Sequence, residues 1–449
     1  MRLGADARDM DDTARELAGR AFADPFPWRF LTELVEVGPR LGGSPGERRA
    51  ADHVAAALDD YGADATVEPF DVQRWERDTT DLSVHVPARD VERAFDPIAL
   101  PYSPPGDVSG ELVDVGHGTP EEVDDADVAG KIVVAATDSP PGSRFVHRME
   151  KFGHAAAAGA AAFVFAHDTP GQLAPTGALR FGEEAAIPGV GVSYETGAWL
   201  REYAAEGTAR LRVDATTEPG TSQNVVGALG PETDEAVLLV AHLDAHDISE
   251  GALDNGCGIA TAVTAVRYLA DCDLDRRVLV AGVGCEETGL LGAQALADRL
   301  DCDRLRAVVN VDGAGRHRDL RALTHGSEPV RDLAERVVDE LGQPLHVTET
   351  PHPYSDHWPF LQRGVPALQL HSRRGDSRER GRGWGHTAAD TRDKADPRTL
   401  RTHAVVTALL VRALTQADLP RVDTADLRGR LEDTDAEPGM RAAGVWPWD

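Results

Sequence analysis

The sequence has few lysines, few cysteines and no long apolar segment. Only three of its 46 basic residues are lysines, at positions Lys131, Lys151 and Lys394. Its four cysteines have neither paired zinc-binding spacing nor the density of a disulfide-rich secreted protein, so free thiols are expected. No run approaches the ~18 apolar residues of a membrane-spanning helix, and the first twelve residues contain no apolar signal segment. These absences predict a soluble cytoplasmic protein without a membrane partner.

Acidic residues dominate what is present. The chain carries 76 acidic against 46 basic residues, a formal net charge of -30. Such a charge repels DNA, RNA and anionic lipid, which excludes them as expected partners. Codon bias explains the missing lysines but not the acidic excess. Adaptation to high salt does explain the acidic excess. At ~1 M salt the Debye length falls to roughly 3 Å, so the repulsion among the carboxylates of the protein is screened. The composition therefore predicts a halophilic protein.

The length of 449 residues exceeds what a single hydrophobic core usually supports. We divide the chain into a helix and strand preface (1–80), an inserted β-rich domain (81–215), an α/β domain (216–420) and an acidic tail (421–449). In the preface, Ser44, Pro45 and Glu47 form a capping-box pattern that begins a helix. In the tail, Trp446 and Trp448 either dock on the body or belong to a disordered end.

Strands and helices alternate in the region 216–420. Apolar runs that predict strands occupy 236–241, 278–283, 307–311, 320–323 and 367–370, and helical patterns lie between them. This alternation implies right-handed crossovers around a mainly parallel sheet that is covered on both faces. The predicted fold class is α/β, a three-layer αβα sandwich with a mixed central sheet, plus the inserted domain.

Polar residues follow the ends of these strands. His242 and Asp244 follow the first run, Glu286 and Glu287 the second, and Asp312 the third. Two further residues, Asp254 and His386, lie in loops at the same rim. Because the carboxyl ends of neighbouring parallel strands meet at one edge, these side chains are expected to converge.

Four carboxylates so close together would raise one another's pKa, and divalent cations remove that cost. Histidine and carboxylate ligands suit two Zn²⁺, with Co²⁺ or Mn²⁺ as alternatives, and one carboxylate can bridge ions about 3.5 to 4 Å apart. We assign Asp254 as the bridge, because its loop lies between two ligand-bearing strands. The remaining metal ligands are then His242 and Asp312 on one ion, and Glu287 and His386 on the other.

Two residues of the group remain for catalytic roles. Glu286 is spare in the ligand count and is expected to act as general base. Asp244 lies two residues from His242 and is expected to accept the second ring proton of that histidine.

The same residues carry a family resemblance. The motifs are His242-Leu243-Asp244, the loop 251–256, Glu286-Glu287-Thr288-Gly289-Leu290-Leu291-Gly292, Asn310-Val311-Asp312, Ser355-Asp356-His357 and His386-Thr387 ahead of Asp390-Thr391. Together they resemble the co-catalytic di-zinc aminopeptidases, a family that includes glutamate carboxypeptidases and glutaminyl-cyclase-like members. The segment from Gly38-Pro39-Arg40 to Tyr61 resembles the amino-terminal segment of that family. The resemblance implies the roles assigned above, with a peptide as substrate.

The inserted domain is similar to a protease-associated domain. The similarity rests on Gly130-Lys131-Ile132-Val133 and on Lys151 ahead of Ala158-Gly159-Ala160. The cysteine-bearing turn often seen in such domains is absent here. An oligomer formed through this domain or through the tail is left open.

Some polar residues near the motifs have two interpretations. His246 and His357 are extra metal ligands or, as favoured, surface or supporting residues, because the assigned set already fills two sites. Tyr354 either donates to an oxyanion or packs in the core. Cys285 is expected to be a small core residue. The arginines of the loop 373–382 either bind a substrate carboxylate or pair with surface acids.

The leading functional prediction is a metal-dependent exopeptidase, most simply an aminopeptidase. A carboxypeptidase or an N-acyl amidohydrolase would share every metal ligand and is the nearest alternative. A binding protein with a degenerate site would lack a ligand or the base, and the sequence lacks neither.

The salt requirement can be measured directly. We expect the thermal midpoint of unfolding to be higher in about 3 M KCl than in about 0.1 M KCl, because the salt screens repulsion among surface carboxylates. Equal midpoints at the two concentrations would contradict the halophilic interpretation.

Overall fold

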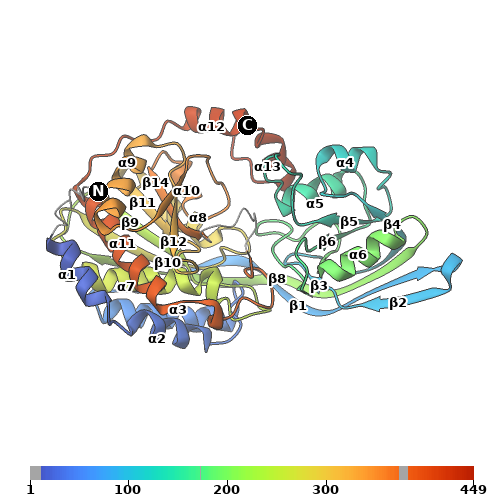
Figure 1. Ribbon diagram of the computed structural model, residues 1–449, viewed down its shortest axis with the longest axis horizontal. Helices are drawn as coiled ribbons and strands as arrows, with labels where there is room; N and C mark the ends of the chain where they lie inside the picture. Colours follow the sequence, from blue (N-terminus) through green and yellow to red (C-terminus); the bar gives the residue numbers. More distant parts are fainter. Residues whose placement is uncertain (1–11, 172, 374–382, 449) are drawn as a thin grey trace, which may run out of the picture.

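The computed structural model describes residues 12–171, 173–373 and 383–448 (Figure 1). A helix-covered core domain holds the central sheet, and an inserted domain of smaller sheets and helices lies beside it (Figure 1). In the described chain no helix is long and apolar enough to cross a membrane.

The core domain is built on a mixed sheet. Its strands are β9 (Ala236–His242), β10 (Arg277–Val283), β11 (Leu305–Val311), β12 (Asp319–Leu323), β13 (Leu345–Thr348) and β14 (Ala367–Arg373). They lie in the order β13-β12-β14-β11-β9-β10, and β8 continues the sheet beyond β10. The pairs β9 with β10, β9 with β11 and β11 with β14 are parallel, whereas β12 is antiparallel to β14. The mainly parallel sheet expected from the sequence is therefore confirmed.

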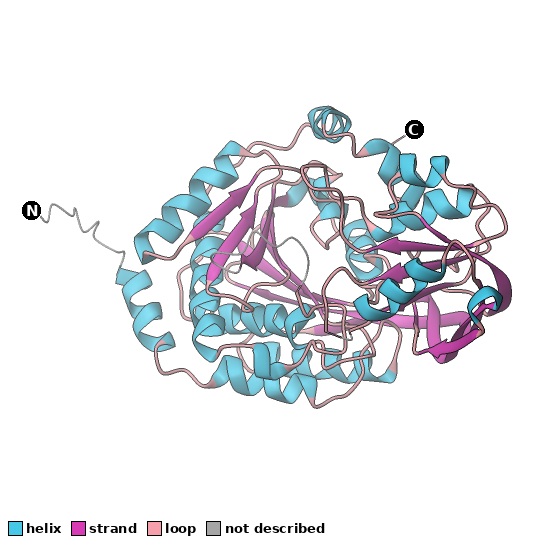
Figure 2. Ribbon diagram, turned by 45° about the vertical axis from the view of Figure 1, so that its right-hand side comes forward, coloured by secondary structure: helices cyan, strands magenta, loops and turns pink. Residues whose placement is uncertain are grey.

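Helices cover both faces of this sheet (Figure 2). One layer contains α1 (Asp12–Ala21), α2 (Phe26–Val35), α3 (Pro45–Asp59), α7 (Cys257–Leu269), α9 (Glu328–Leu341) and α11 (Pro397–Gln416). The other contains α8 (Leu291–Arg299) and α10 (Trp358–Leu361). Alternate residues of the central strand β9 pack into opposite layers: Val237 and Leu239 into the first, Leu238 and Val240 into the second. Burial on both faces explains why this strand is continuously apolar.

Two long antiparallel strands connect the domains. The strands β1 (Thr66–Val86) and β8 (Thr208–Leu229) pair along most of their length, with an irregularity between Arg77 and Thr80. One half of β8 pairs with β10 in the core, and the other half pairs with β4 in the inserted domain. The sequence indicates only short strands here, at 65–70 and 84–86. The domains are thus joined by continuous strands and not by flexible linkers.

The inserted domain has its own strands and helices. They are β2 (Val91–Phe95), β3 (Ile98–Ala99), β4 (Gly106–Asp114), α4 (Pro120–Asp125), β5 (Ile132–Ala136), α5 (Arg148–Ala157), β6 (Ala162–Ala166), β7 (Gly189–Val192) and α6 (Tyr194–Tyr203). The strands β4, β5, β6 and β7 pair in parallel. Side chains of β5 alternate between two hydrophobic clusters, so this small sheet is also buried on both faces.

The start of α3 differs from the expected capping box in one respect. Ser44 is the N-cap and its Oγ accepts the Glu47 N–H at 3.2 Å, as the pattern predicts. The Glu47 carboxylate, however, accepts the N–H groups of Gly43 at 2.7 Å and Cys285 at 2.9 Å. Glu47 is fully buried, and there it supports the backbone that follows β10. Its side chain therefore links α3 to the rim of the sheet.

The carboxyl-terminal segment forms two helices that reach from the core domain to the inserted domain (Figure 1). They are α12 (Thr424–Asp433) and α13 (Glu437–Ala443). Leu427, Leu431 and Met440 pack into a core-domain cluster, and Trp448 meets Trp358 edge to face with ring centroids 6.2 Å apart. On α5 of the inserted domain, a Cβ at Gly153 would lie 2.1 Å from the Ala442 carbonyl oxygen. This close approach is possible because residue 153 is glycine.

A buried histidine ties α11 to the loop after β11. His403 Nδ1 accepts the Gly315 N–H at 2.9 Å, and its Nε2 lies 3.1 Å from the Arg318 carbonyl oxygen. These partners require the neutral ring with its proton on Nε2. Burial lowers the pKa of His403 to about 4.

We predict that His403 makes the protein sensitive to acid. The unfolded chain protonates this residue near pH 6.5 and the folded chain only near pH 4. Its contribution, at most ~3 kcal/mol, is therefore present above pH 6.5 and lost as the pH falls toward 4. His403→Gln should lower the free energy of unfolding at neutral pH by about 1–2 kcal/mol. The same change should make that free energy depend less on pH between about pH 4 and pH 6.5. Denaturant titrations across this pH range measure both effects.

The exposed His85 provides the matched control. His85→Gln should leave the stability and its pH slope unchanged. An undiminished slope in His403→Gln would contradict the assignment.

Candidate metal centre

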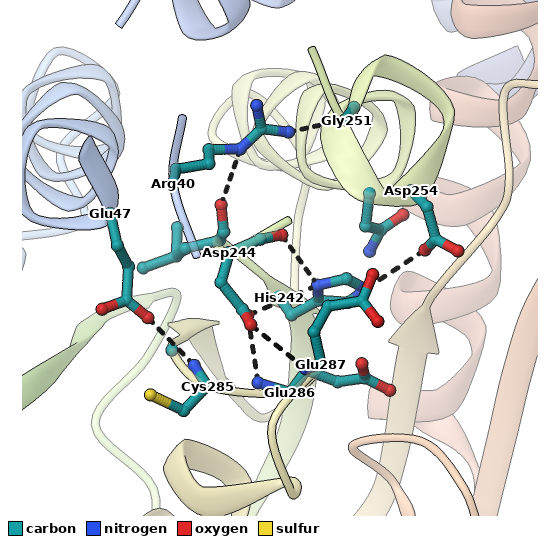
Figure 3. Close-up of polar contacts among 12 residues, drawn as sticks. Arg40, Glu47, His242, Asp244, Gly251, Asp254, Cys285, Glu286 and Glu287 are labelled. Atoms are coloured by element: carbon teal, nitrogen blue, oxygen red, sulfur yellow. Dashed lines mark hydrogen bonds and ion pairs between the residues drawn. The ribbon is translucent and has the colours of Figure 1, made fainter. Parts of the chain in front are cut away.

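The predicted residues gather at the carboxyl ends of three core strands. His242 is the last residue of β9, Glu286 and Glu287 follow β10 by a few residues, and Asp312 directly follows β11. Asp254 lies in the short segment η2 (Ala252–Gly256) that precedes α7, at a position where the backbone is not helical. Figure 3 shows the side chains of His242, Asp254, Glu286 and Glu287 lying close to one another. The convergence expected from the parallel sheet is present in the structure.

Asp254 lies between the two histidines. Its Oδ1 is 3.6 Å from His242 Nε2, and its Oδ2 is 3.5 Å from His386 Nε2. Each oxygen of one carboxylate therefore faces a different imidazole. This is the arrangement that a carboxylate shared by two cations needs.

Two groups of three potential ligands surround Asp254. Within the described residues, His242, Glu286 and Asp312 form one group, and His246, Glu287 and His386 form the other. In each group the ligand atoms lie within 4.8 Å of one another. The structure thus brings His242 together with Asp312, and Glu287 together with His386, in the pairs expected from the sequence. It also adds His246, which sequence reasoning placed outside the ligand set.

Asp244 organises the backbone beneath both groups. Its carboxylate accepts the N–H of Glu286 at 3.0 Å and the N–H of Glu287 at 3.1 Å (Figure 3). His242 Nδ1 lies 3.1 Å from the Asp244 carbonyl oxygen and 3.5 Å from its carboxylate. The buried Asp244 side chain therefore positions Glu286 and Glu287, and the expected contact with His242 is made chiefly by the Asp244 backbone.

The two adjacent glutamates have opposite electrostatic surroundings. Burial would raise the pKa of Glu287, but His246 and His386, at 2.9 and 3.0 Å, hold it well below its usual range. Burial raises the pKa of Glu286 well above its usual range, and Glu287 and Asp312 add to the rise against the opposing His242. A positive charge near Glu286 would favour the ionised form that a general base requires.

Two buried arginines, which the spacing of the motifs does not reveal, also support the site. Arg316 places a guanidinium nitrogen 3.1 Å from Asp254 Oδ1 and donates through Nε to the Leu253 carbonyl at 2.6 Å. Arg40 donates to the carbonyl of Gly251 (Figure 3) and to those of Leu243 and Glu250, and so fixes the loop after β9. Of the two, only Arg40 lies in a segment that the family resemblance indicated.

Further carboxylates and hydroxyls hold the ligands from outside. The Asp390 carboxylate accepts the N–H groups of Leu253 at 2.6 Å and Asp254 at 3.0 Å. Ser355 Oγ donates to Asp312 Oδ2 at 2.7 Å. Such outer contacts fix the orientation of ligand side chains before a cation binds.

The inserted domain reaches into the site. The Thr176 N–H donates to the His386 carbonyl at 2.8 Å, and His386 Nδ1 lies 3.1 Å from the Thr176 carbonyl oxygen. The ring of His147 stacks on Tyr354 of the core domain at a centroid distance of 4.0 Å. The sequence gives no signal for these contacts, because they join backbone and rings from distant segments.

The remaining candidates take supporting places. His357 lies between Asn310 and the His352 carbonyl, outside both potential ligand groups of the described chain. Cys285 is buried, and burial together with Glu47 and Asp244 raises the pKa of its thiol well above the usual range, which opposes a nucleophilic role. Arg373 is exposed at the end of β14. The other residues of the arginine-rich loop, Arg374, Arg378, Arg380 and Arg382, lie outside the described residues.

The donor atoms of the site fit a bound cation. Among the atoms that the structure describes, His242 Nε2, both ring nitrogens of His246 and Glu287 Oε1 are buried without a hydrogen-bond partner. Buried polar atoms are normally paired, and imidazole nitrogens with carboxylate oxygens are the donors that zinc and similar metals accept. These residues therefore suit one or more divalent cations.

Comparison with known proteins finds a similar family for each of the two domains. The sequence profile of peptidase family M28 matches residues 224–411, and that of the PA domain matches residues 108–200. Aminopeptidase YwaD of Bacillus subtilis is 25% identical over 445 residues, 96% of this chain and 92% of that protein. Leucine aminopeptidase 2 of Trichophyton rubrum is 29% identical over 289 residues, 60% of this chain and 57% of its own length.

Solved structures share the whole architecture. An aminopeptidase from Aneurinibacillus sp. strain AM-1 superposes with a TM-score of 0.69 at 26% identity, covering 91% of this chain and 97% of that one. A peptidase M28 precursor from Shewanella amazonensis gives a TM-score of 0.75 at 25% identity, with 91% and 98% coverage. The α/β domain of the chain is thus similar to peptidase family M28, and its inserted domain is similar to the PA domain.

Proposed function

We propose that this chain is a metal-dependent aminopeptidase that uses two Zn²⁺ to hydrolyse the first bond of a peptide. The observation that carries the proposal is the position of Asp254, whose two oxygens face His242 and His386 from opposite sides. The similarity to aminopeptidase YwaD over 96% of the chain supports the same activity.

The residues that would hold the two ions follow from the two groups. Asp254 would be shared, His242 and Asp312 would complete one position, and Glu287 and His386 the other. Bound there, the ions would polarise the scissile carbonyl and make a water molecule acidic enough to attack it. The mixed nitrogen and oxygen ligands also accept Co²⁺ or Mn²⁺.

Glu286 is positioned to move the proton. Its carboxyl group lies in the same group as His242 and Asp312, and its backbone is held by Asp244. A general base at this place takes a proton from the attacking water and delivers it to the departing amine. Burial keeps bulk water from competing for that proton.

The charge of the site favours a substrate amine over a substrate carboxylate. The rim carries four carboxylates from Asp254, Glu286, Glu287 and Asp312. Arg316, a buried arginine beside this rim, is already occupied by Asp254 and the Leu253 carbonyl. A peptide that presents its ammonium group to this rim therefore binds more favourably than one that presents its carboxylate.

The remaining expectations stay predictions. They are the loading of two ions, the identity of the native metal, a cytoplasmic location, adaptation to high salt and any oligomer formed through the inserted domain or the carboxyl-terminal helices.

Replacing the proposed base tests the mechanism. Glu286→Gln should lower kcat by about 10²- to 10⁴-fold, because the amide cannot accept the proton. Metal content should be unchanged, since Glu286 is not assigned as a ligand. Steady-state kinetics and elemental analysis of the same preparations measure both quantities.

A matched control is Glu335→Gln, which removes one exposed carboxylate from α9. Its kcat should equal that of the unmodified protein. Full activity in Glu286→Gln would remove this residue from its role, and loss of metal in that variant would make it a ligand.

A substrate panel tests the direction of cleavage. We expect hydrolysis of aminoacyl p-nitroanilides and free dipeptides, and a large loss of kcat/KM when the amino group is acetylated, because the acyl cap removes the positive charge. Preference for N-acetylated peptides, with release of the carboxyl-terminal residue, would instead establish a carboxypeptidase or an N-acyl amidohydrolase.

A further inference from the structure

His246 is a buried histidine that the proposed mechanism does not use. It lies four residues after His242 in the loop following β9 and is 3% exposed. Among the described residues neither ring nitrogen makes a hydrogen bond of good geometry, although Nε2 lies within ion-pair distance of Glu287. A buried imidazole left in this state costs free energy unless something else satisfies its nitrogen.

The ring is directed at a potential ligand. His246 Nε2 lies 2.9 Å from Glu287 Oε2, and His386 Nε2 lies 3.0 Å from the same oxygen. The two imidazoles meet nearly edge to face, at a centroid distance of 4.4 Å and an interplanar angle of 75°.

Hydrogen bonding alone does not account for this geometry. If both imidazoles only donated hydrogen bonds, each would more favourably use a different oxygen of Glu287. Both instead face Oε2, and Oε1 is buried without a hydrogen-bond partner in the described chain. Three donor atoms from three side chains instead meet at one point, within 4.8 Å of one another. Convergence of this kind is what a cation requires of its ligands.

We infer that His246 is an additional protein ligand at the ion position of Glu287 and His386, and that it makes this position the tighter of the two. The inference rests on the proposed two-metal function and adds a third imidazole to it. With the shared Asp254, the position then has four ligand residues: His246, Asp254, Glu287 and His386.

The opposite position is weaker for a second, independent reason. Arg316 lies 3.1 Å from Asp254 Oδ1, the oxygen that faces His242. Its fixed positive charge repels a cation there and competes for the same oxygen. The oxygen that faces His386 is Oδ2, at 3.5 Å. The bridging carboxylate is therefore shared unequally.

This asymmetry divides the work between the ions. A position with four protein ligands resembles a structural zinc site, whereas a catalytic site keeps a place open for water or substrate. The open place then belongs to the His242 and Asp312 position, and Glu286 belongs to the same group. The base and the open place are thus on the same side of Asp254.

Metal titration of the apoprotein tests the difference in affinity. The unmodified protein should bind the first Co²⁺ equivalent more tightly than the second in competition with a chromophoric chelator. His246→Gln should lower the affinity for the first ion by at least about tenfold, the lower end of losses seen when a residue that only orients a ligand is removed. His53→Gln is the matched control, because it removes a partly buried imidazole that stacks on Phe30 in the preface helices. That variant should titrate like the unmodified protein.

Paramagnetic NMR of the Co²⁺ protein decides whether His246 is itself a ligand. At one equivalent, hyperfine-shifted ring signals from two histidines, His246 and His386, are expected in the unmodified protein and from one in His246→Gln. At two equivalents three histidines should be shifted, since His242 joins them. Circular dichroism of each variant establishes that it is folded.

The possible failures are distinct. Binding of two ions with only two shifted histidines, or equal first and second affinities, would overturn the inference and leave the two-metal function intact. Absence of any bound ion would overturn the proposed function itself.

Discussion

Repulsion among buried carboxylates is the constraint on which this structure depends. Asp254, Glu286, Glu287 and Asp312 come from three separate loops and lie close together in a largely buried site. Like charges at this distance cannot all be ionised without a counter-charge. Arg316 supplies one positive charge at Asp254, and the imidazoles of His242, His246 and His386 face the remaining oxygens. Bound cations would complete the balance, and the same cations are what peptide hydrolysis needs.

Each part of the fold contributes to holding these groups in place. The preface supplies Arg40 and Glu47, which fasten the loops after β9 and β10. The inserted domain contacts His386 through the Thr176 backbone, and the helices α12 and α13 connect that domain to the core. Because β1 and β8 run through both domains without interruption, the inserted domain is an extension of the catalytic framework. Its Thr176 backbone lies directly against His386 at the edge of the site.

Local sequence patterns were sufficient to predict much of the fold and of the site. Apolar runs predicted β9, β10 and β11, and the rule that parallel strands end at one edge brought His242, Glu287 and Asp312 together. The family motifs added Asp390. The sequence pattern did not predict the full lengths of β1 and β8. Long parts of both strands have exposed or partly exposed side chains, so they contain no continuous apolar run.

The remaining features depend on tertiary contacts that a local pattern does not contain. The contact with Thr176 uses backbone atoms that carry no sequence signature. Glu47 matched the capping-box pattern, yet its carboxyl group accepts the N–H of Gly43 and, from the loop after β10, the N–H of Cys285. His246 was set aside because a full ligand set had already been counted, and only its distance to Glu287 shows that it belongs to the site.

The central claim is that a pair of cations holds these carboxylates together, and anomalous scattering from crystals grown with zinc tests it most directly. The account predicts two anomalous peaks, one on either side of Asp254 and each in contact with one of its oxygens. A single peak that leaves His242 and Asp312 without a bound ion would contradict this claim. Zinc bound only elsewhere on the acidic surface would contradict it as well.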